Sequence, residues 1–405
     1  MKFLLEKLEK MAPDFEPGGK LEKLYPLFEA KDTFLFTPAD VTTGKTHFRD
    51  AVDMKRVMIT VVLALIPSFL FGIWNVGHQY NVVNQVEGAT FISDILMGAR
   101  YVLPIVFVSY LVGGICEVTF AIIRKHEINE GFLVTGLLFP LTLPPTVPLW
   151  QVAAGIAFGT IIGKEIFGGT GFNFLNPALT ARAFCFFAFP AKMSGEIWTV
   201  VKSGPDASVL EGWSAATPLA VAAAAGNGDK EMLNIALADA GFSLQTMFSG
   251  IEGGSIAETS VVPILIGALI LLATGVGSWQ IMAGGVAGLC GAAVVLDFMP
   301  SENYLSFFHL GPIGHLLIGS FLFGIVFMAT DPVSAAATET GKWIYGAMIG
   351  VLTVLIRVTN PAYPEGVMLS ILFMNAMAPL IDHYVVKGHI KKRNAYIQSF
   401  KTAEG

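Results

Sequence analysis

Charged residues are scarce in this sequence, and their scarcity excludes an ordinary soluble fold. Asp, Glu, Lys and Arg make up 14% of the 405 residues, whereas 54% are hydrophobic. Soluble domains carry about 25% charged residues. The mean hydropathy of +0.64 points the same way. A soluble chain of this length would need far more polar surface, so the composition predicts a membrane protein that crosses the bilayer several times.

Cysteines are few, and basic runs and a signal peptide are missing. Cys116, Cys185 and Cys290 lie in apolar stretches without metal-ligand spacing, so we interpret them as small buried residues. No basic run indicates nucleic-acid binding. The N-terminus is too charged for a signal peptide. Five of its residues are spaced to form the apolar face of a short interfacial helix: Phe3, Leu4, Leu5, Leu8 and Met11.

Ten apolar segments follow a mixed, charged segment at residues 1–54. They are residues 57–75, 101–123, 131–147, 151–167, 177–190, 261–278, 281–299, 313–330, 343–359 and 366–386. Several are shorter than the roughly 20 residues that a straight crossing needs, or are interrupted by Gly and Pro. The weakest are the third, which contains Pro144-Pro145, and the fifth. We therefore expect an all-α polytopic membrane protein with about ten transmembrane helices.

The segments divide into two groups of five. Residues 55–190 form a predicted first membrane repeat and residues 261–386 a second. The acidic stretch 191–260 connects them, and 387–405 form a tail. Asn176-Pro-Ala-Leu-Thr-Ala181 and Asp331-Pro-Val-Ser-Ala-Ala336 each follow an apolar segment and hint at duplication. Because five spans are an odd number, we predict a 5+5 inverted repeat with broken helices, which typically places a binding site near the membrane midplane.

The basic residues indicate an orientation. With both termini in the cytoplasm, the connection 191–260 lies outside the membrane, and Arg100 and Arg357 are the exceptions on that outer side. The remaining loop cations fall on the cytoplasmic side, as the positive-inside rule requires. They are Lys55, Arg56, Arg124, Lys125, Lys164, Arg182, Lys342, Lys387, Lys391, Lys392 and Arg393.

A polar stretch, FGGTGFNFLNPALTARAF at 167–184, interrupts the apolar region. At membrane depth, irregular backbone is tolerated only where it is buried in protein or lines a wet cavity. The amides of Asn173 and Asn176 can read the edge of a polar heterocycle or coordinate a cation. Equally, they can cap a helix that begins at Pro177. The spacing alone leaves both interpretations open.

Five motifs together carry a family resemblance. GGTGFNFLNPALTARAF stands with GGICEV at 113–118, RKHEINEGF at 124–132, MATDPVSA at 328–335 and NPAYPEG at 360–366. The chain resembles, over essentially its whole length, the B-subunit family of the sodium-translocating NADH:quinone oxidoreductase. The related D subunit of the Rnf ferredoxin:NAD oxidoreductase shares the membrane core. It usually lacks the long N-terminal extension, so residues 1–54 favour the quinone enzyme.

The resemblance implies site residues and cofactors. Asn173 and Asn176 match a riboflavin site, and Thr217 matches the threonine that carries FMN through a phosphoester bond. A quinone site is implied at Gly113, Gly114 and Glu117. A sodium path is implied at Glu117, Asp331, Asp382 and Glu29.

Each of these residues has a plainer interpretation. The two glycines can serve close helix packing, and Glu29 can be a solvated surface residue. Asp382, near Lys387, can be an interfacial charge. Thr217 can be the N-cap of a helix that begins at Pro218.

The flavin-attachment segment departs from the family pattern. The family usually reads Ser-Gly-Ala-Thr, whereas this chain has Ser214-Ala-Ala-Thr217, with Ala215 in place of glycine. The reactive hydroxyl is kept, but the change puts efficient attachment in doubt if the attaching enzyme needs a sharp bend.

The resemblance implies a membrane subunit of a redox-driven sodium pump in a bacterial inner membrane. Electrons from NADH enter through the other subunits of a six-subunit complex, pass through flavins in this chain and reduce a quinone while sodium is exported. A flavin transferase is an implied partner. Gly168 to Gly171 lack the strand–helix context of a dinucleotide fold. The alternatives are the Rnf D subunit, which needs no quinone site, and a small-solute channel, which needs no chromophore.

Overall fold

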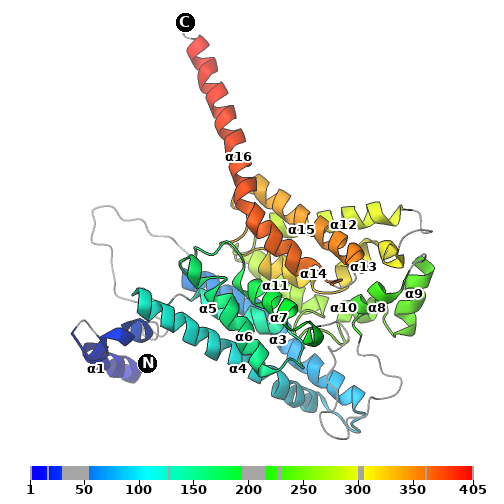
Figure 1. The fold of residues 1–405 in the computed structure, drawn as a ribbon, viewed down its shortest axis with the longest axis horizontal. Coiled ribbons are helices and arrows are strands. Elements are labelled where there is room, and N and C mark those ends of the chain that lie inside the picture. Colours follow the sequence, from blue (N-terminus) through cyan, green and yellow to red (C-terminus); the bar gives the residue numbers. More distant parts are fainter. Residues whose placement is uncertain are drawn as a thin grey trace.

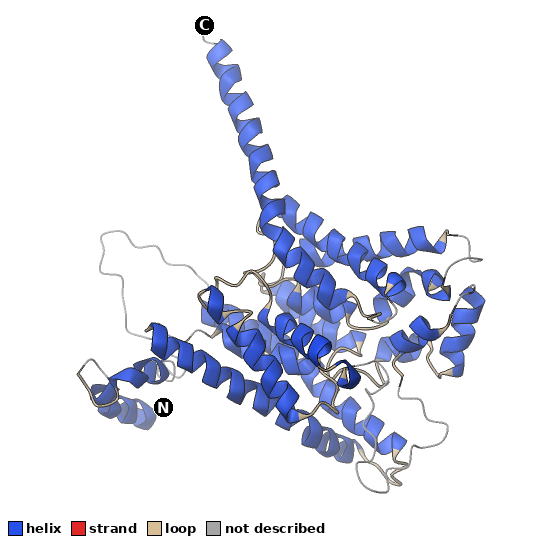
Figure 2. Ribbon diagram, viewed as in Figure 1, coloured by secondary structure: helices blue, strands red, loops and turns tan. Residues whose placement is uncertain are grey.

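The computed structural model describes residues 2–15, 18–29, 54–125, 128, 130–193, 216–226, 228, 230–299, 305–360 and 363–403. Within these residues all regular structure is helical and no β-strand forms (Figure 2). The helices gather into one bundle, while the end of α16 projects away from it and α1 is drawn apart (Figure 1). The prediction of an all-α membrane protein is therefore confirmed.

Ten helical units correspond to the ten predicted apolar segments. The first half contains α3 (Met54–Val83), α4 (Phe91–Arg124), α5 (Gly131–Leu141), α6 (Leu149–Ile161) and α7 (Pro177–Ala188). The second half contains α11 (Val261–Ala273), α12 (Trp279–Asp297), a bent unit, α15 (Glu339–Thr359) and α16 (Val367–Ala403). The bent unit is α13 (Gly311–Leu317) followed by α14 (Phe321–Phe323) and the π-helix η6 (Gly324–Met328).

Length separates these units into two classes. Among the described residues, five helices are long and apolar enough to cross a membrane alone, namely α3, α4, α12, α15 and α16, and the bent unit can supply a sixth span. The other four, α5, α6, α7 and α11, have only 11 to 13 residues. Because a straight crossing needs about 20 residues, these four helices rely on their neighbours and on ordered loops.

The N-terminal segment and the connection also contain helices. The predicted N-terminal helix is α1 (Lys2–Phe15), and Glu29 lies in a second short helical turn at 25–29. The connection contains α8 (Pro218–Ala224), α9 (Lys230–Asp239) and α10 (Leu244–Ser249). Residues 30–53 and 194–215, and with them Ala215, lie outside the described residues.

Helices α3 and α4 extend well beyond the apolar segments that predicted them, because polar side chains pair between them. Asn81 of α3 donates to Asp94 of α4 at 2.6 Å, and His78 lies 3.1 Å from the same carboxylate. Thr90 caps α4 by accepting from the backbone N–H of Ser93. Hydropathy ends the predicted segments where these polar residues begin, whereas the helices continue through them.

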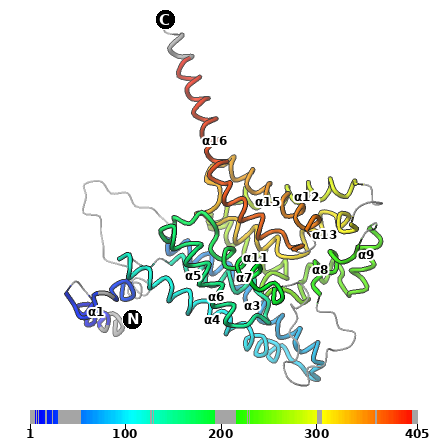
Figure 3. The backbone as a smooth tube through the Cα atoms, viewed as in Figure 1, coloured from blue at the N-terminus to red at the C-terminus, as the bar shows by residue number. Residues whose placement is uncertain are grey.

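The two halves, whose course along the chain Figure 3 traces, repeat the same packing relations. In each half the second unit packs on the third and fourth, the fourth packs on the fifth, and the third contacts the first and fifth. The halves meet through α3 with α11 and α7 with α16. One relation differs, because α3 and α4 pack along each other whereas α11 and α12 make no comparable contact.

A sequence match supports the repeat, but at a different place from the one predicted. Residues 136–144 read GLLFPLTLP and residues 324–332 read GIVFMATDP, which share Gly, Phe, Thr and Pro at the same spacing. Both stretches lie at the end of the third unit of their half. Asn176 instead precedes a fifth unit, so it is not the counterpart of Asp331. Asp331 corresponds to Leu143.

Glycines allow α12 and α15 to pack backbone against backbone. A Cβ on Gly288 of α12 would overlap the carbonyl oxygen of Ala347, and one on Gly350 of α15 would overlap that of Gly285. Small residues at such a seam let two membrane helices approach closely. This pair forms the most extensive helix contact in the described structure.

Arg357 satisfies the backbone at the break between α13 and α14. Its guanidinium donates to the carbonyl oxygens of His315 at 2.5 Å and Ile318 at 2.9 Å, and Nε donates to that of Glu365 at 3.2 Å. The unit bends by 71° at this break. A helix end in a buried environment needs partners for its free carbonyls, and a single buried arginine supplies two of them. From the sequence, Arg357 was considered only as an exception to the positive-inside rule, and nothing in its spacing indicated these partners.

The end of the predicted external connection lies inside the bundle. The backbone N–H groups of Ile256 and Ala257 donate to the carbonyl oxygens of Leu143 and Leu141, each at 3.1 Å. Ile256 and Ala257 are almost fully buried. Residues 250–260 therefore satisfy the end of α5 in the way that Arg357 satisfies the end of α13.

We predict that Gly288→Ala destabilises the protein, because the new methyl group overlaps the backbone of α15. Overpacking of this kind costs about 1–3 kcal/mol. Gly291→Ala is the matched control on the same helix, since a Cβ there has no neighbour within 4 Å. Thermal unfolding of the detergent-solubilised protein measures both. Equal melting temperatures for the two variants would contradict the seam.

Candidate functional site

One face of α4 is buried along the helix and carries two predicted site residues. Gly113 and Glu117 lie on it, one helical turn apart. A Cβ on Gly113 would overlap the ring of Phe132 from α5, so this glycine is needed for packing. Gly114 lies off this face, and an added Cβ there would have its nearest neighbour at 4.0 Å. The two adjacent glycines therefore have different structural roles.

Glu117 forms a buried ion pair. Lys164 Nζ lies 2.6 Å from Glu117 Oε1 and 3.7 Å from Glu165 Oε1. Glu117 and Lys164 are each 3% exposed, and Glu165 is 1% exposed. Lys164 was predicted to be a loop cation, and it does lie in the turn after α6, but the structure buries it there.

Lys164 also lines a small pocket where the two Pro-containing motifs meet. The pocket has a volume of about 70 Å³, and Asn173, Asn176 and Asp331 lie in its wall. The side-chain amide of Asn176 also lies 3.5 Å from the carbonyl oxygen of Met328, at the end of η6. The sequence predicted a shared site from these motifs, and the structure brings them together although they are not repeat equivalents.

Asn176 is an N-cap. Its Oδ1 accepts from the backbone N–H groups of Ala178 at 3.0 Å and Leu179 at 3.2 Å, and Pro177 follows as the first helical residue. Asn173 donates to the carbonyl of Leu175 at 3.0 Å. The capping interpretation thus holds for Asn176, whereas Asn173 makes only one local bond among the described contacts.

The pocket at the two asparagines is smaller than a flavin, because pockets for such ligands measure roughly 300–1,000 Å³. Next to Asn173 the surface is aromatic: Phe172 is 72% exposed and Phe174 43%. Gly168, Gly169 and Gly171 have positive φ values of 128°, 96° and 91°, a backbone that only glycine adopts readily. A planar ring at this site would therefore lie on the aromatic surface and not inside the pocket.

Thr217 opens onto a much larger cavity. It is the N-cap of α8, and its Oγ1 accepts from the N–H of Ala220 at 3.2 Å. The cavity has a volume of about 440 Å³, and Thr217 lines it together with Arg182, Glu258 and Glu365. Its size is that of a typical ligand pocket. The predicted flavin-attachment residue thus lies at a cavity of cofactor size.

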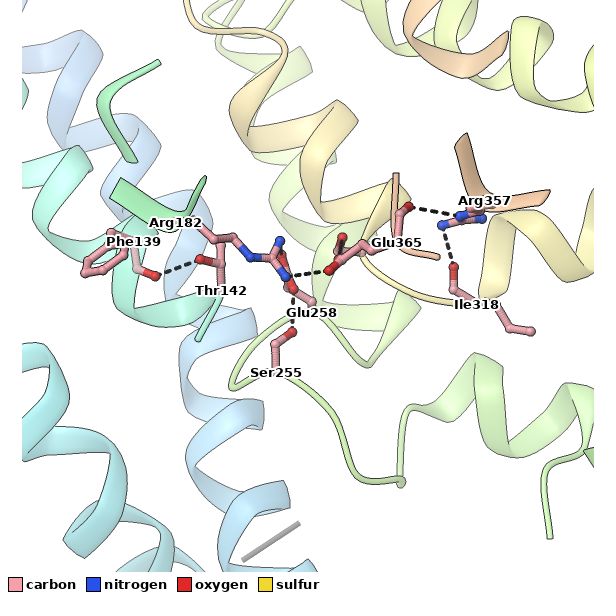
Figure 4. A network of polar contacts seen from close by, with 9 residues as sticks. Phe139, Thr142, Arg182, Ser255, Glu258, Ile318, Arg357 and Glu365 are labelled. Atoms are coloured by element: carbon pink, nitrogen blue, oxygen red, sulfur yellow. Dashed lines mark hydrogen bonds and ion pairs between the residues drawn. The ribbon is translucent and has the colours of Figure 1, made fainter. Parts of the chain in front are cut away.

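Figure 4 shows a buried ionic network, and Arg182, Glu258 and Glu365 of this network line the cavity. Arg182 of α7 lies 2.6 Å from Glu365, which follows α15, and 3.6 Å from Glu258, which precedes α11. It therefore joins the first half to the second half and to the segment before it. Ser255 donates to Glu258 at 2.5 Å. Glu365 leads on to Arg357 through its backbone carbonyl. Arg182 was predicted to be a cytoplasmic loop cation, and the structure instead places it in a helix at the same cavity as Thr217.

The acids of the 250–260 segment are held in a low-dielectric environment. Burial raises the pKa of Glu252 to about 8. The pKa of Glu258 is also raised, because burial outweighs the opposing effect of Arg182. The hydroxyl of Tyr363 and Oε2 of Glu252 are buried without a hydrogen-bond partner in the described structure, and both residues line the cavity. The cavity wall can therefore still bind a polar ligand.

The predicted sodium residues lie in three separate places. Asp331 follows η6 and accepts from the hydroxyl of Ser334 at 2.8 Å and the N–H of Val333 at 3.2 Å. Asp382 of α16 accepts from the turn before α15, through both backbone N–H groups of Ala337 and Thr338. Glu29 lies in the N-terminal segment. Asp331 lines the same pocket as Lys164, and Lys164 is the partner of Glu117, so these two acids are linked through the lysine.

Comparison with known proteins gives the family. The model of the NQR2, RnfD, RnfE family matches residues 41–391. The Na(+)-translocating NADH-quinone reductase B subunit of Ectopseudomonas mendocina is 49% identical over 411 residues, covering 96% of this chain and 98% of the relative. The B subunit of Azotobacter vinelandii is also 49% identical with the same coverage, and that of Yersinia pestis is 47% identical over 417 residues. The chain belongs to the NQR2, RnfD, RnfE family.

The sequence did not identify several residues that line the two cavities of this NQR2-family chain. Lys164 and Arg182 were considered only as markers of orientation, and Glu258 only as part of an acidic connection. A charged residue within an apolar stretch is costly unless it is paired, and that signal was available for Arg182 in 177–190. Nothing in the spacing indicates that its partners are Glu258 and Glu365, which lie 76 and 183 residues away.

Substitutions of Gly113 and Gly114 in this NQR2-family chain can distinguish a packing role from a role in ligand binding. We predict that Gly113→Ala lowers the melting temperature, because its methyl group overlaps Phe132, whereas Gly114→Ala leaves it unchanged. Quinone reduction is then measured with both variants. A raised KM for quinone in Gly114→Ala at normal stability would place quinone here. A normal KM in Gly114→Ala would leave the pair with a packing role only.

Proposed function

We propose that this chain is the flavin-carrying B subunit of a Na+-translocating NADH-quinone reductase in a bacterial membrane. The relatives with this name match it end to end at 47–49% identity. The observation that carries the flavin assignment is the cavity of about 440 Å³ at Thr217. The helices that cross the bilayer fit a multi-pass subunit. Other subunits of the complex, a quinone and Na+ are the partners that this function requires.

Thr217 is proposed to carry FMN through a phosphoester bond. Thr217 is half-buried and lines a cavity whose wall also contains two buried polar groups without a hydrogen-bond partner, the Tyr363 hydroxyl and Oε2 of Glu252. Arg182 and Arg357 supply positive charge nearby. A bound flavin supplies one- and two-electron transfer. The protein's part is to exclude water, to fix the ring and to balance charge through the ionic network.

Riboflavin is proposed to lie at Asn173, beside the exposed rings of Phe172 and Phe174. Aromatic surfaces of this kind stabilise planar rings by stacking, and the amide of Asn173 can bind a polar edge. Asn176 has a different part in this proposal, since it holds the start of α7. Because the aromatic surface is open in this chain, a neighbouring subunit would cover the ring.

Sodium handling is proposed for Asp331, which lines the pocket at Asn176, and for Glu117, which pairs with Lys164 of the same pocket. Hard cations prefer oxygen ligands, and the pocket offers carboxylate, amide and hydroxyl oxygens. Asp382 and Glu29 are proposed to act at other stages of the path. The hydrogen bonds that Asp382 receives from the turn at 337–338 also give it a structural role.

The remaining proposals follow from the resemblance. Quinone is proposed to bind beside Gly114, near Glu117. Both termini are proposed to lie in the cytoplasm, and a flavin transferase to act on Thr217 from the other side. The Rnf D subunit is the second candidate, since it belongs to the same family. Quinone reduction by the purified complex separates the two. A channel would carry no chromophore.

We predict that Thr217→Ala abolishes the in-gel flavin fluorescence of this subunit when the cells contain the transferase. Ser243→Ala is the matched control, because Ser243 is also an N-cap in the connection, on α10, and its loss costs a similar amount, about 1 kcal/mol. The mass of the peptide that contains Thr217 identifies the attached group. An unmodified peptide in the wild type would show that Ala215 or its surroundings prevent attachment.

We predict that Asn173→Leu removes non-covalent riboflavin while the protein still assembles. A site that loses its amide rejects a polar ligand by roughly tenfold to a few hundredfold. Asn176→Asp is the control, since it keeps the capping oxygen for Ala178 and Leu179. Riboflavin is extracted and quantified per complex. Full riboflavin content in Asn173→Leu would refute the assignment.

A further inference from the structure

Lys164 lies between two buried carboxylates. Its ammonium contacts Glu117 at 2.6 Å and Glu165 at 3.7 Å, and it lies 5.9 Å from the centre of the Phe132 ring. All three charged side chains are at most 4% exposed. Two desolvated carboxylates require a cation close by, and Lys164 is the fully buried one that supplies it.

Glu165 has binding capacity that the lysine does not use. Neither of its side-chain oxygens accepts a hydrogen bond in the described structure. Arg124 approaches one of them only to 4.0 Å and donates instead to the backbone carbonyl of Glu165 at 2.5 Å. A buried carboxylate whose two oxygens accept no hydrogen bond is a ready ligand for a hard cation such as sodium.

A second position for the ammonium lies next to the first. Lys164 lines the pocket of about 70 Å³, whose wall also contains Asp331, Asn173 and Thr330. Each of these three residues has a side-chain oxygen. The lysine side chain is a flexible four-carbon stem that ends in a compact charge, so it can change position without backbone movement.

We propose that Lys164 determines the sodium affinity of this subunit: its ammonium occupies the cation site of Glu117 and Glu165, and sodium enters only when the ammonium moves into the adjoining pocket. The proposal rests on the role of Glu117 in sodium handling. Charge is conserved at the acids, since one cation replaces another. The ammonium that moves aside is received by Asp331.

Replacing Lys164 changes the sodium affinity in opposite directions if the lysine competes with sodium and if it only supports the fold. A lysine that only holds the fold would weaken sodium binding when it is replaced. A lysine that competes with sodium strengthens binding when it is replaced. Lys164→Met should therefore lower the half-saturating sodium concentration by about tenfold or more, because a buried charge pair is replaced by a carboxylate that needs a cation.

The purified complex is tested by sodium-dependent thermal stabilisation without NADH, at constant ionic strength with choline chloride. Binding to the folded state raises the melting temperature with sodium concentration. The sodium dependence of quinone reduction is measured in parallel. Lys192→Met, which removes an exposed lysine, is the control and should match the wild type in both measurements.

Lys164→Arg is the second variant. The guanidinium keeps the positive charge and binds a carboxylate through two parallel hydrogen bonds. It is also too large to move into the adjoining pocket. It should raise the half-saturating sodium concentration. If Lys164→Met does not assemble, an unchanged or lower value in Lys164→Arg overturns the proposal. An unchanged or higher value in Lys164→Met overturns it as well.

Glu117→Gln separates this proposal from the proposed function. If Glu117→Gln loses the sodium response while Lys164→Met behaves as the wild type, only the role of Lys164 is refuted. If Glu117→Gln responds to sodium as the wild type does, the role of Glu117 fails, and the competition with Lys164 fails with it.

Discussion

Arg357 makes the interrupted helix of the second half possible, because its guanidinium binds the carbonyl oxygens of His315 and Ile318 that the break leaves without partners. The same requirement, that buried backbone groups be satisfied, governs the other interruptions. The 250–260 segment meets it for α5, Asn176 for α7, and Asp382 for the turn before α15. Each of these polar groups thus lies where a helix begins or ends. The cavity at Thr217 and the pocket at Asn176 lie beside two of these breaks.

Capping a helix and binding a ligand require the same polar atoms. The structure shows, for each residue, whether those atoms are already used for capping. Asn176 commits its oxygen to α7, whereas Asn173 keeps most of its amide available. Thr217 caps α8 and yet borders the large cavity, so attachment of a flavin would exchange one role for another. A break in a helix supplies both a cavity and unpaired polar groups. This is why functional residues gather at the breaks without being free of structural duties.

The sequence predicted the ten helical units because apolar composition is a local property. It did not predict how far α3 and α4 extend, because Asp94 pairs with Asn81 across a helical hairpin and hydropathy scores both as loop residues. The burial and the ion-pair partners of Lys164 and Arg182 were missed for a related reason: these charges were assigned by their neighbours in the sequence, while their partners come from other segments. The site residues around Asn176 and Thr217 were identified only through the resemblance. Their cavities depend on packing between the halves, which no local pattern encodes.

The continuation of α16 fixes how far the C-terminus stands from the bilayer. The apolar part, Val367 to Val386, spans about 30 Å at 1.5 Å per residue, which is the thickness of the hydrocarbon layer. The helix continues without interruption to Ala403, adding about 25 Å by the same rise. Lys391, Lys392 and Arg393 are thereby carried on a rigid rod and not on a loose tether. The length of the helix therefore sets the height above the lipid headgroups at which these cations face water or an adjoining subunit.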